Sequence, residues 1–528
     1  MSLLAVEGLD LAIGGMPILR EVSLQVGPGE VLGVIGESGS GKSMTALAVM
    51  GLLPERARAA GAVRLEGRDL LALTEAEMCA VRGREVSMVF QEPMTALNPL
   101  QTIGAQVAET VLVHTGAGRR EARAVARAVL DRVGLPAARF GLDRYPHELS
   151  GGQRQRVVIA MAIALRPKLL IADEPTTALD VTTQAQILAL LRRLVAEDGM
   201  GLMLITHDLA VVADVADRLA IMRAGEVVES GPTRRVLAER RHPYTRALFA
   251  ASAHQPERRA PTRRAPLLEV QGVVREYPLG RRGVIGPRRT FAAVRGVSFV
   301  LEEGESLGLV GESGCGKSTL TRAILGLEAL QGGRVQIEGE AVRAGEAMPR
   351  SLRAKMQVVF QDPYGSFNPR HRVARLVTEP FHLLDDPPRG AERQAAIARA
   401  LEDVGLAPSD AEKYIHEFSG GQRQRIAIAR ALIIRPKLII LDEAVSGLDV
   451  QVRAQILDLL ADLSGRYGLS YLFITHDLTV VRAITDRVMV MQAGEIVEEG
   501  PTAMVFADPQ HPYTRELLDA APVLEIAG

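Results

Sequence analysis

Short apolar runs alternate along the chain with longer segments in which apolar residues recur at helical spacing. The runs EVLGVIG (30–36), KLLIAD (168–173) and GLMLIT (201–206) are bounded by glycine or polar residues, a pattern typical of strands buried in a parallel sheet. Residues 182–198 instead place apolar side chains on one helical face and charges on the other. Strands that alternate with helices predict the α/β class.

One series of motifs occurs twice, in the same order. The pairs are GESGSGKS (36–43) and GESGCGKS (311–318), LSGGQRQR (149–156) and FSGGQRQR (418–425), LLIADE (169–174) and LIILDE (438–443), ITHDL (205–209) and ITHDL (474–478), and HPYTRALF (242–249) and HPYTRELL (511–518). Ser150 and Asp173 are 23 positions apart, as are Ser419 and Asp442. Equal spacing in both copies predicts that the intervening fold is also repeated, as in a duplicated domain.

The segment between the copies is rich in proline, arginine and alanine and has no periodicity. We therefore expect a first domain at residues 1–251, a solvated linker at 252–266 and a second domain at 267–528. Contact of the linker arginines with anionic lipid headgroups is the alternative. The second copy also carries an extra basic segment, 280–289, which we expect to be a surface loop.

Length and composition agree with two globular domains and exclude several kinds of site. The chain has 528 residues, of which 47% are hydrophobic, and its formal net charge of −1 argues against a whole-surface affinity for nucleic acid. Its two cysteines, Cys79 and Cys315, lie far apart, so neither a disulfide framework nor a zinc cage nor a four-cysteine iron–sulfur site is expected. The first residues resemble a strand more than a signal peptide. The apolar run 157–165 is far shorter than the roughly 20 residues of a membrane span, so a cytoplasmic protein is expected.

Each copy of GxxxxGK[ST] follows an apolar strand and precedes a helix, the context in which this motif binds nucleotide phosphates. The glycines let backbone N–H groups surround a phosphate, and the helix N-terminus adds positive potential. We expect Lys42 and Lys317 to bridge the β- and γ-phosphates of ATP, and Ser43 and Ser318 to give an oxygen to Mg²⁺. The predicted nucleotide-binding residues of these loops are Gly36, Gly39, Gly41, Lys42, Ser43 and Met44, and Gly311, Gly314, Gly316, Lys317, Ser318 and Thr319.

Two consecutive carboxylates follow a buried strand in each copy. Asp173 and Asp442 end the strands, where a metal-associated carboxylate is required. Glu174 and Glu443, one residue later, can orient and deprotonate the attacking water. An Asp-Glu pair alone is usually part of a solvated loop, but this position predicts a catalytic pair.

A histidine closes another apolar strand in each copy, His207 in LMLITH and His476 in YLFITH. A single histidine of this kind is more often structural. Because both follow the strand aspartate by 34 positions, we predict that they contact the γ-phosphate.

The SGGQ motif ahead of each acidic strand is the most specific signal. With it, nearly the whole sequence resembles the ABC transporter ATPase family, which implies two P-loop NTPase modules, each with a RecA-like core and a helical signature subdomain. In that family the signature residues bind the γ-phosphate of ATP held on the opposite module, so the resemblance implies two composite sites, Lys42 with Ser419 and Lys317 with Ser150. The matching signature residues are Ser150, Gly151, Gly152 and Gln153, and Ser419, Gly420, Gly421 and Gln422, and those of the D-loop that crosses between the sites are Asp180 and Asp449.

Gln91 and Gln361 match the family's Q-loop, which touches Mg²⁺ and senses the membrane partner. The runs FQEPMTALNP (90–99) and FQDPYGSFNP (360–369), with the HPYTR tails, resemble the oligopeptide/dipeptide importer branch, with its two ATPase subunits fused. This resemblance implies two transmembrane permease subunits and an extracytoplasmic substrate-binding protein. It places the chain peripherally on the cytoplasmic face of a bacterial inner membrane, with ATP and Mg²⁺ as cofactors and no nucleic acid partner.

Three features depart from the family pattern. Adenine stacks on an aromatic residue in the family; Tyr277 fits in the second half, but Ile13 takes that place in the first, which predicts weaker ATP affinity at the Lys42 site. Ala444 replaces the usual proline after Glu443, a change expected to affect loop rigidity rather than chemistry. No cysteine lies near the HPYTR tails, so the iron–sulfur cluster of several relatives is not expected. Neither copy has lost a reactive residue, and both sites should hydrolyse ATP.

Two other functions remain open at this stage. A soluble tandem ABC ATPase that acts on ribosomes or nucleic acid usually has a long charged helical linker or cysteine zinc sites, whereas this linker is short and proline-rich. A tandem ATPase of a sugar importer usually has one degraded module and lacks the HPYTR tails. The sequence does not identify the cargo: peptide, modified peptide, glutathione and nickel all fit the importer branch.

Overall fold

The computed structural model describes residues 2–90, 96–177, 179–258, 265–279, 289–344, 348–362 and 365–522. Gln91, linker residues 259–264 and segment 280–288 lie outside the described residues, so what was predicted for them stays a prediction. Among the residues that are described, no helix is both long and apolar enough to cross a membrane.

The first half contains two sheets. Its strands are β1 (Leu4–Ile13), β2 (Met16–Val26), β3 (Val31–Ile35), β4 (Ala57–Leu65), β5 (Arg68–Asp69), β6 (Val86–Val89), β7 (Leu169–Asp173), β8 (Gly201–Ile205), β9 (Arg218–Arg223) and β10 (Glu226–Pro232). They form a four-stranded sheet, β2-β1-β4-β5, and a six-stranded sheet, β10-β9-β3-β8-β7-β6. Strands β3, β7 and β8 are parallel and fully buried, as predicted for residues 30–36, 168–173 and 201–206.

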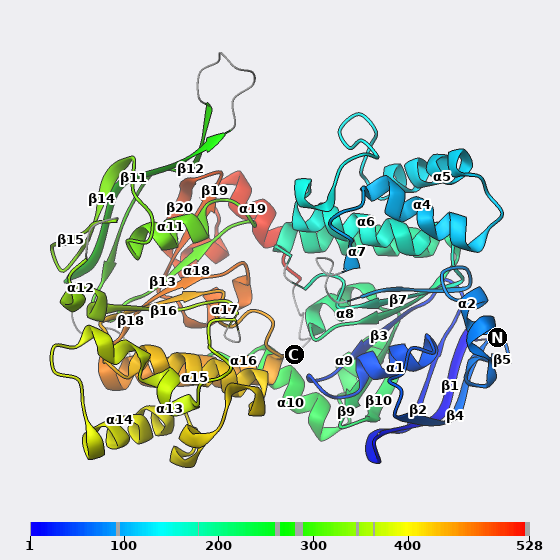
Figure 1. Cartoon of the computed structure of the whole chain (residues 1–528), viewed down its shortest axis with the longest axis horizontal. Coiled ribbons are helices and arrows are strands. Elements are labelled where there is room, and N and C mark those ends of the chain that lie inside the picture. Colours follow the sequence, from blue (N-terminus) through cyan, green and yellow to red (C-terminus); the bar gives the residue numbers. More distant parts are fainter. Residues whose placement is uncertain are drawn as a thin grey trace.

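Helices of the first half lie on the six-stranded sheet or in a separate layer. They are α1 (Lys42–Val49), α2 (Glu75–Val81), α4 (Ile103–His114), α5 (Arg119–Arg132), α6 (Gly151–Ile163), α7 (Val181–Asp198), α8 (Leu209–Val215), α9 (Thr233–Glu239) and α10 (Pro243–Ser252). Helix α7 covers the predicted helix 182–198 and buries Ile187, Leu191 and Leu194. Helices α4, α5 and α6 pack on one another to form the helical layer that carries the first SGGQ motif (Figure 1).

The second half repeats this plan with sheets β12-β11-β14-β15 and β16-β17-β18-β13-β19-β20. Its strands are β11 (Pro266–Leu279), β12 (Arg289–Glu302), β13 (Ser306–Val310), β14 (Gly332–Ile337), β15 (Glu340–Val342), β16 (Met356–Val359), β17 (Leu438–Asp442), β18 (Ser470–Ile474), β19 (Arg487–Gln492) and β20 (Glu495–Pro501). Its helices are α11 (Lys317–Ile324), α12 (Arg350–Lys355), α13 (Val373–Val377), α14 (Gly390–Asp403), α15 (Gly420–Leu432), α16 (Val450–Tyr467), α17 (Leu478–Ile484), α18 (Thr502–Ala507) and α19 (Pro512–Asp519). The α/β class with two P-loop modules is confirmed.

The two halves lie side by side and exchange helix contacts (Figure 1). Helix α10 of the first half packs on α16 of the second, and α19 of the second packs on α7 of the first. His254 lies 2.6 Å from Asp458 on α16. Arg258, expected in a solvated linker, instead donates hydrogen bonds to Ser306 and Asp486, so this part of the linker packs on the second half.

Candidate functional site

Each phosphate loop joins a buried parallel strand to a helix, β3 to α1 and β13 to α11. Gly36 has φ 156°, and a Cβ there would lie 2.2 Å from the Met222 carbonyl, so only glycine fits. The N-caps Gly41 and Gly316 make no side-chain cap bond, and the first turns hold no acidic residue. The helix N-termini are thus free to bind an anion. Both helices begin with the predicted residues, Lys42, Ser43 and Met44, and Lys317, Ser318 and Thr319.

The lysine of each loop is buried inside the loop. Lys42 Nζ donates to the carbonyl oxygens of Gly36 at 2.7 Å and Glu37 at 2.8 Å. Lys317 makes the same pair of bonds to its own loop. Burial lowers the pKa of Lys42, and the carboxylates of Glu174, Asp173 and Asp449 oppose this shift. The lysine therefore lies among negative groups at the place where phosphates would bind.

The Asp173 carboxylate lies beside the first turn of α1 and is 5% exposed. Burial raises the pKa of Asp173, and a hydrogen bond with Ser43 opposes the shift. Asp173 Oδ1 is buried and has no hydrogen-bond partner among the described residues. A hydroxyl next to an unsatisfied carboxylate oxygen is a set of hard oxygen donors, which suits Mg²⁺. The residues present therefore fit a magnesium ion that also binds phosphate oxygens and water.

The corresponding carboxylate of the second half is Asp442. Burial and the neighbouring Glu443 raise the pKa of Asp442 to about 6, and Lys317 opposes the shift. No group of three or more His, Cys, Asp or Glu side chains that could hold a metal occurs in the described part of the chain. A divalent ion here would therefore depend on nucleotide phosphates for part of its coordination.

Glu174 follows β7 with φ 47°, a left-handed conformation that is rare outside glycine. Its N–H donates to the Ile205 carbonyl at 2.8 Å, which holds this strained residue beside β8. His207 Nδ1 lies 3.3 Å from Glu174 Oε1, and Thr177 donates to Oε2 at 2.9 Å. Burial alone would raise the pKa of Glu174, but His207, Thr177 and Lys42 together lower it to about 2. The carboxylate is thus ionised and held in one orientation.

The second half repeats this arrangement with one more partner. Glu443 has φ 51°, and its Oε1 lies 3.4 Å from His476 Nδ1. Gln361 Nε2 donates to Glu443 Oε2 at 2.6 Å, so the predicted Q-loop glutamine contacts the predicted catalytic glutamate directly. Burial opposes ionisation of Glu443, but His476 and Lys317 lower its pKa. The predicted glutamate and histidine are therefore together in both halves.

Each SGGQ motif forms the N-terminus of a helix, α6 or α15. Ser150 Oγ accepts the Gln153 N–H at 3.4 Å, and Gln153 Oε1 accepts the Ser150 N–H at 3.0 Å, a reciprocal capping box. A Cβ on Gly152 would lie 2.2 Å from Thr183, whereas one on Gly151 would meet nothing closer than 3.6 Å. The second glycine is thus required for packing on α7, whereas the first has room for a side chain. Ser419, Gly420, Gly421 and Gln422 repeat the capping box and both glycine environments.

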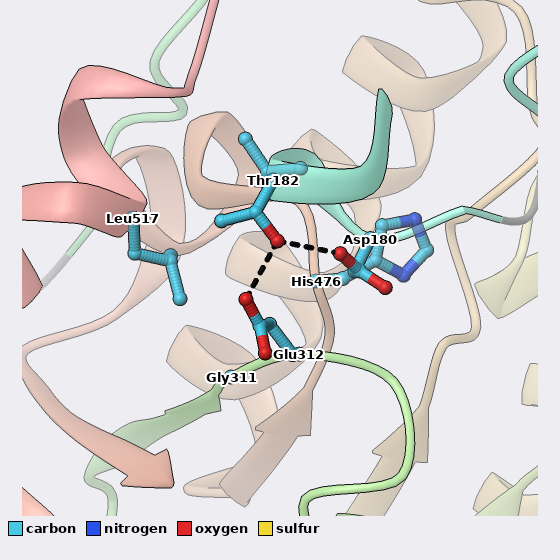
Figure 2. A pocket seen from close by; sticks show the side chains of 7 residues that line it. Asp180, Thr182, Gly311, Glu312, His476 and Leu517 are labelled. Carbon is cyan, nitrogen blue, oxygen red and sulfur yellow. Dashed lines mark hydrogen bonds between the residues drawn. The ribbon is translucent and has the colours of Figure 1, made fainter. Parts of the chain in front are cut away.

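The D-loops contact the phosphate loops across the two halves. Asp180 accepts the backbone N–H of Ser313, in the second phosphate loop. Thr182 Oγ1 lies 2.6 Å from Glu312 Oε1 and 2.8 Å from Asp180 Oδ1, so its hydroxyl is within hydrogen-bond distance of both carboxylates (Figure 2). Burial lowers the pKa of Lys42, and Asp449 of the opposite half is one of the carboxylates that oppose this shift. Each phosphate loop therefore lies near a carboxylate of the other half, while the pairing of Lys42 with Ser419 and of Lys317 with Ser150 stays a prediction.

The expected adenine positions lie on the hairpins before each loop. Tyr277 donates to Glu328 at 2.5 Å, and the Arg275 guanidinium lies over its ring at 4.6 Å. Its cross-strand partner is Phe291, which is 49% exposed. In the first half the same pair is Ile13 and Met16, and Met16 is 68% exposed. The aromatic residue is thus doubled in one module and absent from the other.

Sequence reasoning missed several residues at these sites. Thr177 orients Glu174, and Thr182 reaches Glu312 in the other module. Thr177 follows the acidic pair by three positions and could have been noticed as a nearby donor. Thr182 and Phe291 could not, because their roles depend on contacts with segments distant in sequence.

Comparisons with known proteins agree with this geometry. The family model described as ABC transporter matches residues 19–177 and 294–446. The model described as oligopeptide/dipeptide transporter, C-terminal region, matches residues 228–272 and 497–527.

Similar proteins cover nearly the whole chain. The glutathione import ATP-binding protein GsiA of Escherichia coli O157:H7 is 47% identical over 99% of this chain and 90% of its own length. GsiA of Salmonella typhimurium (strain LT2) is also 47% identical with the same coverage. The dimeric structure of MJ0796, a bacterial ABC transporter cassette, is 27% identical, covers 45% of this chain and 99% of its own, and has a TM-score of 0.40. The chain belongs to the ABC transporter family, in its oligopeptide/dipeptide branch, and is a double-module ATPase subunit of an importer.

Proposed function

We propose that this ATPase energises the import of glutathione or a related small peptide through a bacterial inner-membrane transporter. The observation that carries the cargo proposal is the 47% identity, over 99% of the chain, to ATP-binding proteins named for glutathione import. Cargo is selected by membrane subunits and a capture protein, so the cargo proposal rests on the relatives and not on the residues of the ATPase.

The described residues support a role for each chemical group. Lys42 and Lys317 lie where they can bind the β- and γ-phosphates. Mg²⁺, when bound, supplies charge neutralisation between the phosphates, held by Ser43 and Asp173 and by Ser318 and Asp442.

Glu174 and Glu443 orient the attacking water and accept its proton. His207 and His476, 3.3 and 3.4 Å from these carboxylates, hold them in place and contact the γ-phosphate. The signature turns supply a second helix N-terminus from the opposite module, so ATP brings the halves together and hydrolysis separates them.

A hollow beside the second Q-loop suits a segment of a membrane partner. It has a volume of about 350 Å³ and is lined by Phe360, Glu379, Pro380, Leu383 and Arg430, between β16 and α15. Phe360 is 40% exposed, and Phe90, at the matching place in the first half, is 43% exposed. We infer that two permease subunits dock at these two places, which makes the chain peripheral on the cytoplasmic membrane face.

Transport in reconstituted vesicles tests the proposal. The chain is co-expressed with the permeases and the capture protein encoded beside it, and the complex is reconstituted in vesicles. ATP is supplied on the side of the membrane that carries the ATPase. Transport of labelled glutathione and of a labelled dipeptide to that side is then measured. ATP-dependent glutathione uptake, abolished by the double change Glu174→Gln and Glu443→Gln, is expected. Uptake of neither compound, with ATP hydrolysis intact, would refute the cargo proposal while leaving the importer assignment in place.

A further inference from the structure

Each HPYTR motif forms a rigid helix start. His242 Nδ1 accepts the Tyr244 N–H at 3.2 Å and so caps α10, while Pro243 occupies the first helical position. Thr245 donates to Glu229, which also accepts the backbone N–H groups of Arg241 and His242. The same cap and proline begin α19. The motif therefore fixes the position of its central tyrosine.

That tyrosine binds the phosphate loop of its own half. Tyr244 Oη accepts the Glu37 N–H at 3.1 Å, and Tyr513 Oη accepts the Glu312 N–H at 2.9 Å. Both tyrosines are 4% exposed. Because the tyrosine side chains are buried, each hydroxyl is shielded from water and gives its loop N–H a fixed acceptor.

The peptide group bound by the tyrosine is also the one bound by the loop lysine. Lys42 Nζ donates to the Gly36 carbonyl at 2.7 Å, and Lys317 Nζ donates to the Gly311 carbonyl at 2.6 Å. The Gly36 carbonyl and the Glu37 N–H belong to one planar peptide group, so tyrosine and lysine hold its opposite sides. Rotation of this peptide would move the lysine away from the phosphates.

The helices that carry these tyrosines also contact the other module. Helix α10 packs on α16, and α19 packs on α7 (Figure 1). Leu517 of α19 lines a small pocket with Asp180, Thr182 and His476 (Figure 2). Each tyrosine is thus carried by a helix that also packs on the opposite half.

We propose that Tyr244 and Tyr513 are positioning residues of the two ATP sites, which hold the phosphate loop in its binding shape from a helix that packs on the opposite module. This inference rests on the proposed function, because it assigns the tyrosines to the ATP sites named there. It also gives the HPYTR motif a chemical role: the histidine, proline and threonine fix a helix whose tyrosine hydroxyl supports the phosphate loop.

Tyr244→Phe and Tyr513→Phe in the full chain test it, because each removes only the hydroxyl. ADP and ATP binding is measured at one site at a time, with the lysine of the other loop changed to alanine, and adenosine is measured by competition. We expect each variant to weaken ADP and ATP about fivefold at its own site and to leave adenosine unchanged, since only the phosphates touch the loop. In the chain with both lysines, KM for ATP should rise while kcat stays within about twofold.

Tyr471→Phe is the matched control. Tyr471 is fully buried and its hydroxyl donates to the Leu460 carbonyl at 3.0 Å, away from both phosphate loops. It should lower thermal stability and leave nucleotide affinity unchanged. Should the motif variants fail to fold, hydrogen exchange of the Glu37 and Glu312 amides is measured in the unmodified chain. Slow exchange supports the hydrogen bonds to the two tyrosines, and exchange as fast as in an open loop contradicts them.

Two results would overturn the inference. Unchanged ADP and ATP affinity in both motif variants would show that the hydroxyls do not position the loops, and an equal loss in Tyr471→Phe would show a general effect of stability. Both leave the proposed function standing if the unmodified chain hydrolyses ATP; a chain that hydrolyses none would remove the proposed function and this inference together.

Discussion

Adenine stacking should make the two ATP sites unequal. The hairpin before the first phosphate loop pairs Ile13 with Met16, whereas the hairpin before the second pairs Tyr277 with Phe291. The informative changes are Ile13→Tyr, which adds an aromatic ring, and Tyr277→Ile, which removes one.

The structure limits the size of the effect. Stacking of a base on an aromatic side chain contributes roughly 1–3 kcal/mol. Tyr277 offers only one free face, because the Arg275 guanidinium lies 4.6 Å from the ring centre on the other, and its hydroxyl is tied to Glu328. Phe291, half exposed on the partner strand, can keep part of the contact. We therefore expect about 1–2 kcal/mol, or roughly 5- to 30-fold in affinity.

Binding of a fluorescent ATP analogue to single-site chains measures this difference. In the Lys317→Ala chain the measured binding is that of the first site, and in the Lys42→Ala chain it is that of the second. We expect the second site to bind more tightly, Tyr277→Ile to weaken it to an affinity between those of the two unmodified sites because Phe291 remains, and Ile13→Tyr to tighten the first.

A control separates the ring from its hydroxyl. Tyr277→Phe breaks the bond to Glu328 but keeps the stacking surface, so affinity should stay within about twofold. Equal affinity of the two unmodified sites, or a loss in Tyr277→Phe as large as that in Tyr277→Ile, would refute the stacking argument.

Three further changes test the chemistry and the interface. Glu174→Gln or Glu443→Gln should trap ATP and reduce turnover, because an amide cannot accept the proton; unchanged ATPase rates in either variant would show that its site is not catalytic. Gly152→Ala should lower the free energy of unfolding by about 1–3 kcal/mol in urea titrations, since its Cβ would lie 2.2 Å from Thr183. Unaltered stability would show that α7 moves to make room for the methyl group. Thr182→Val should weaken nucleotide binding at the second site and not at the first, because its hydroxyl reaches only the second phosphate loop; equal effects at both sites would contradict this.

The sequence predicted most of the fold because local rules decided it. Buried parallel strands such as β7 require continuous apolar runs, and α7 shows clear helical spacing. Glycines that need positive φ, such as Gly39 at 79°, mark the phosphate loops without any alignment. The candidate catalytic residues could be named because both copies place them at strand ends.

Contacts between distant segments could not be predicted. Nothing in the motif around Tyr513 indicates that its hydroxyl meets Glu312, some 200 residues earlier in the chain. The positive φ of Glu174 could not be predicted either, because that backbone conformation normally favours glycine and the sequence has glutamate at this position. Arg258 was expected in solvent and packs instead, because its partner Asp486 lies between α17 and β19, 228 residues further along the chain.

The second phosphate loop shows why the two modules should respond to nucleotide as a unit. Glu312 is held at its N–H by Tyr513 and at its carboxylate by Thr182, while Asp180 accepts the next N–H, that of Ser313. Two of these three partners come from the opposite half, so a shift of the loop on phosphate release must disturb α7 of the first module. The first loop lacks the contact that Thr182 makes with Glu312. Gln451 occupies the position of the threonine in the second half and makes no such bond among the described residues. Loss of phosphate at the second site should therefore move the interface more than loss at the first.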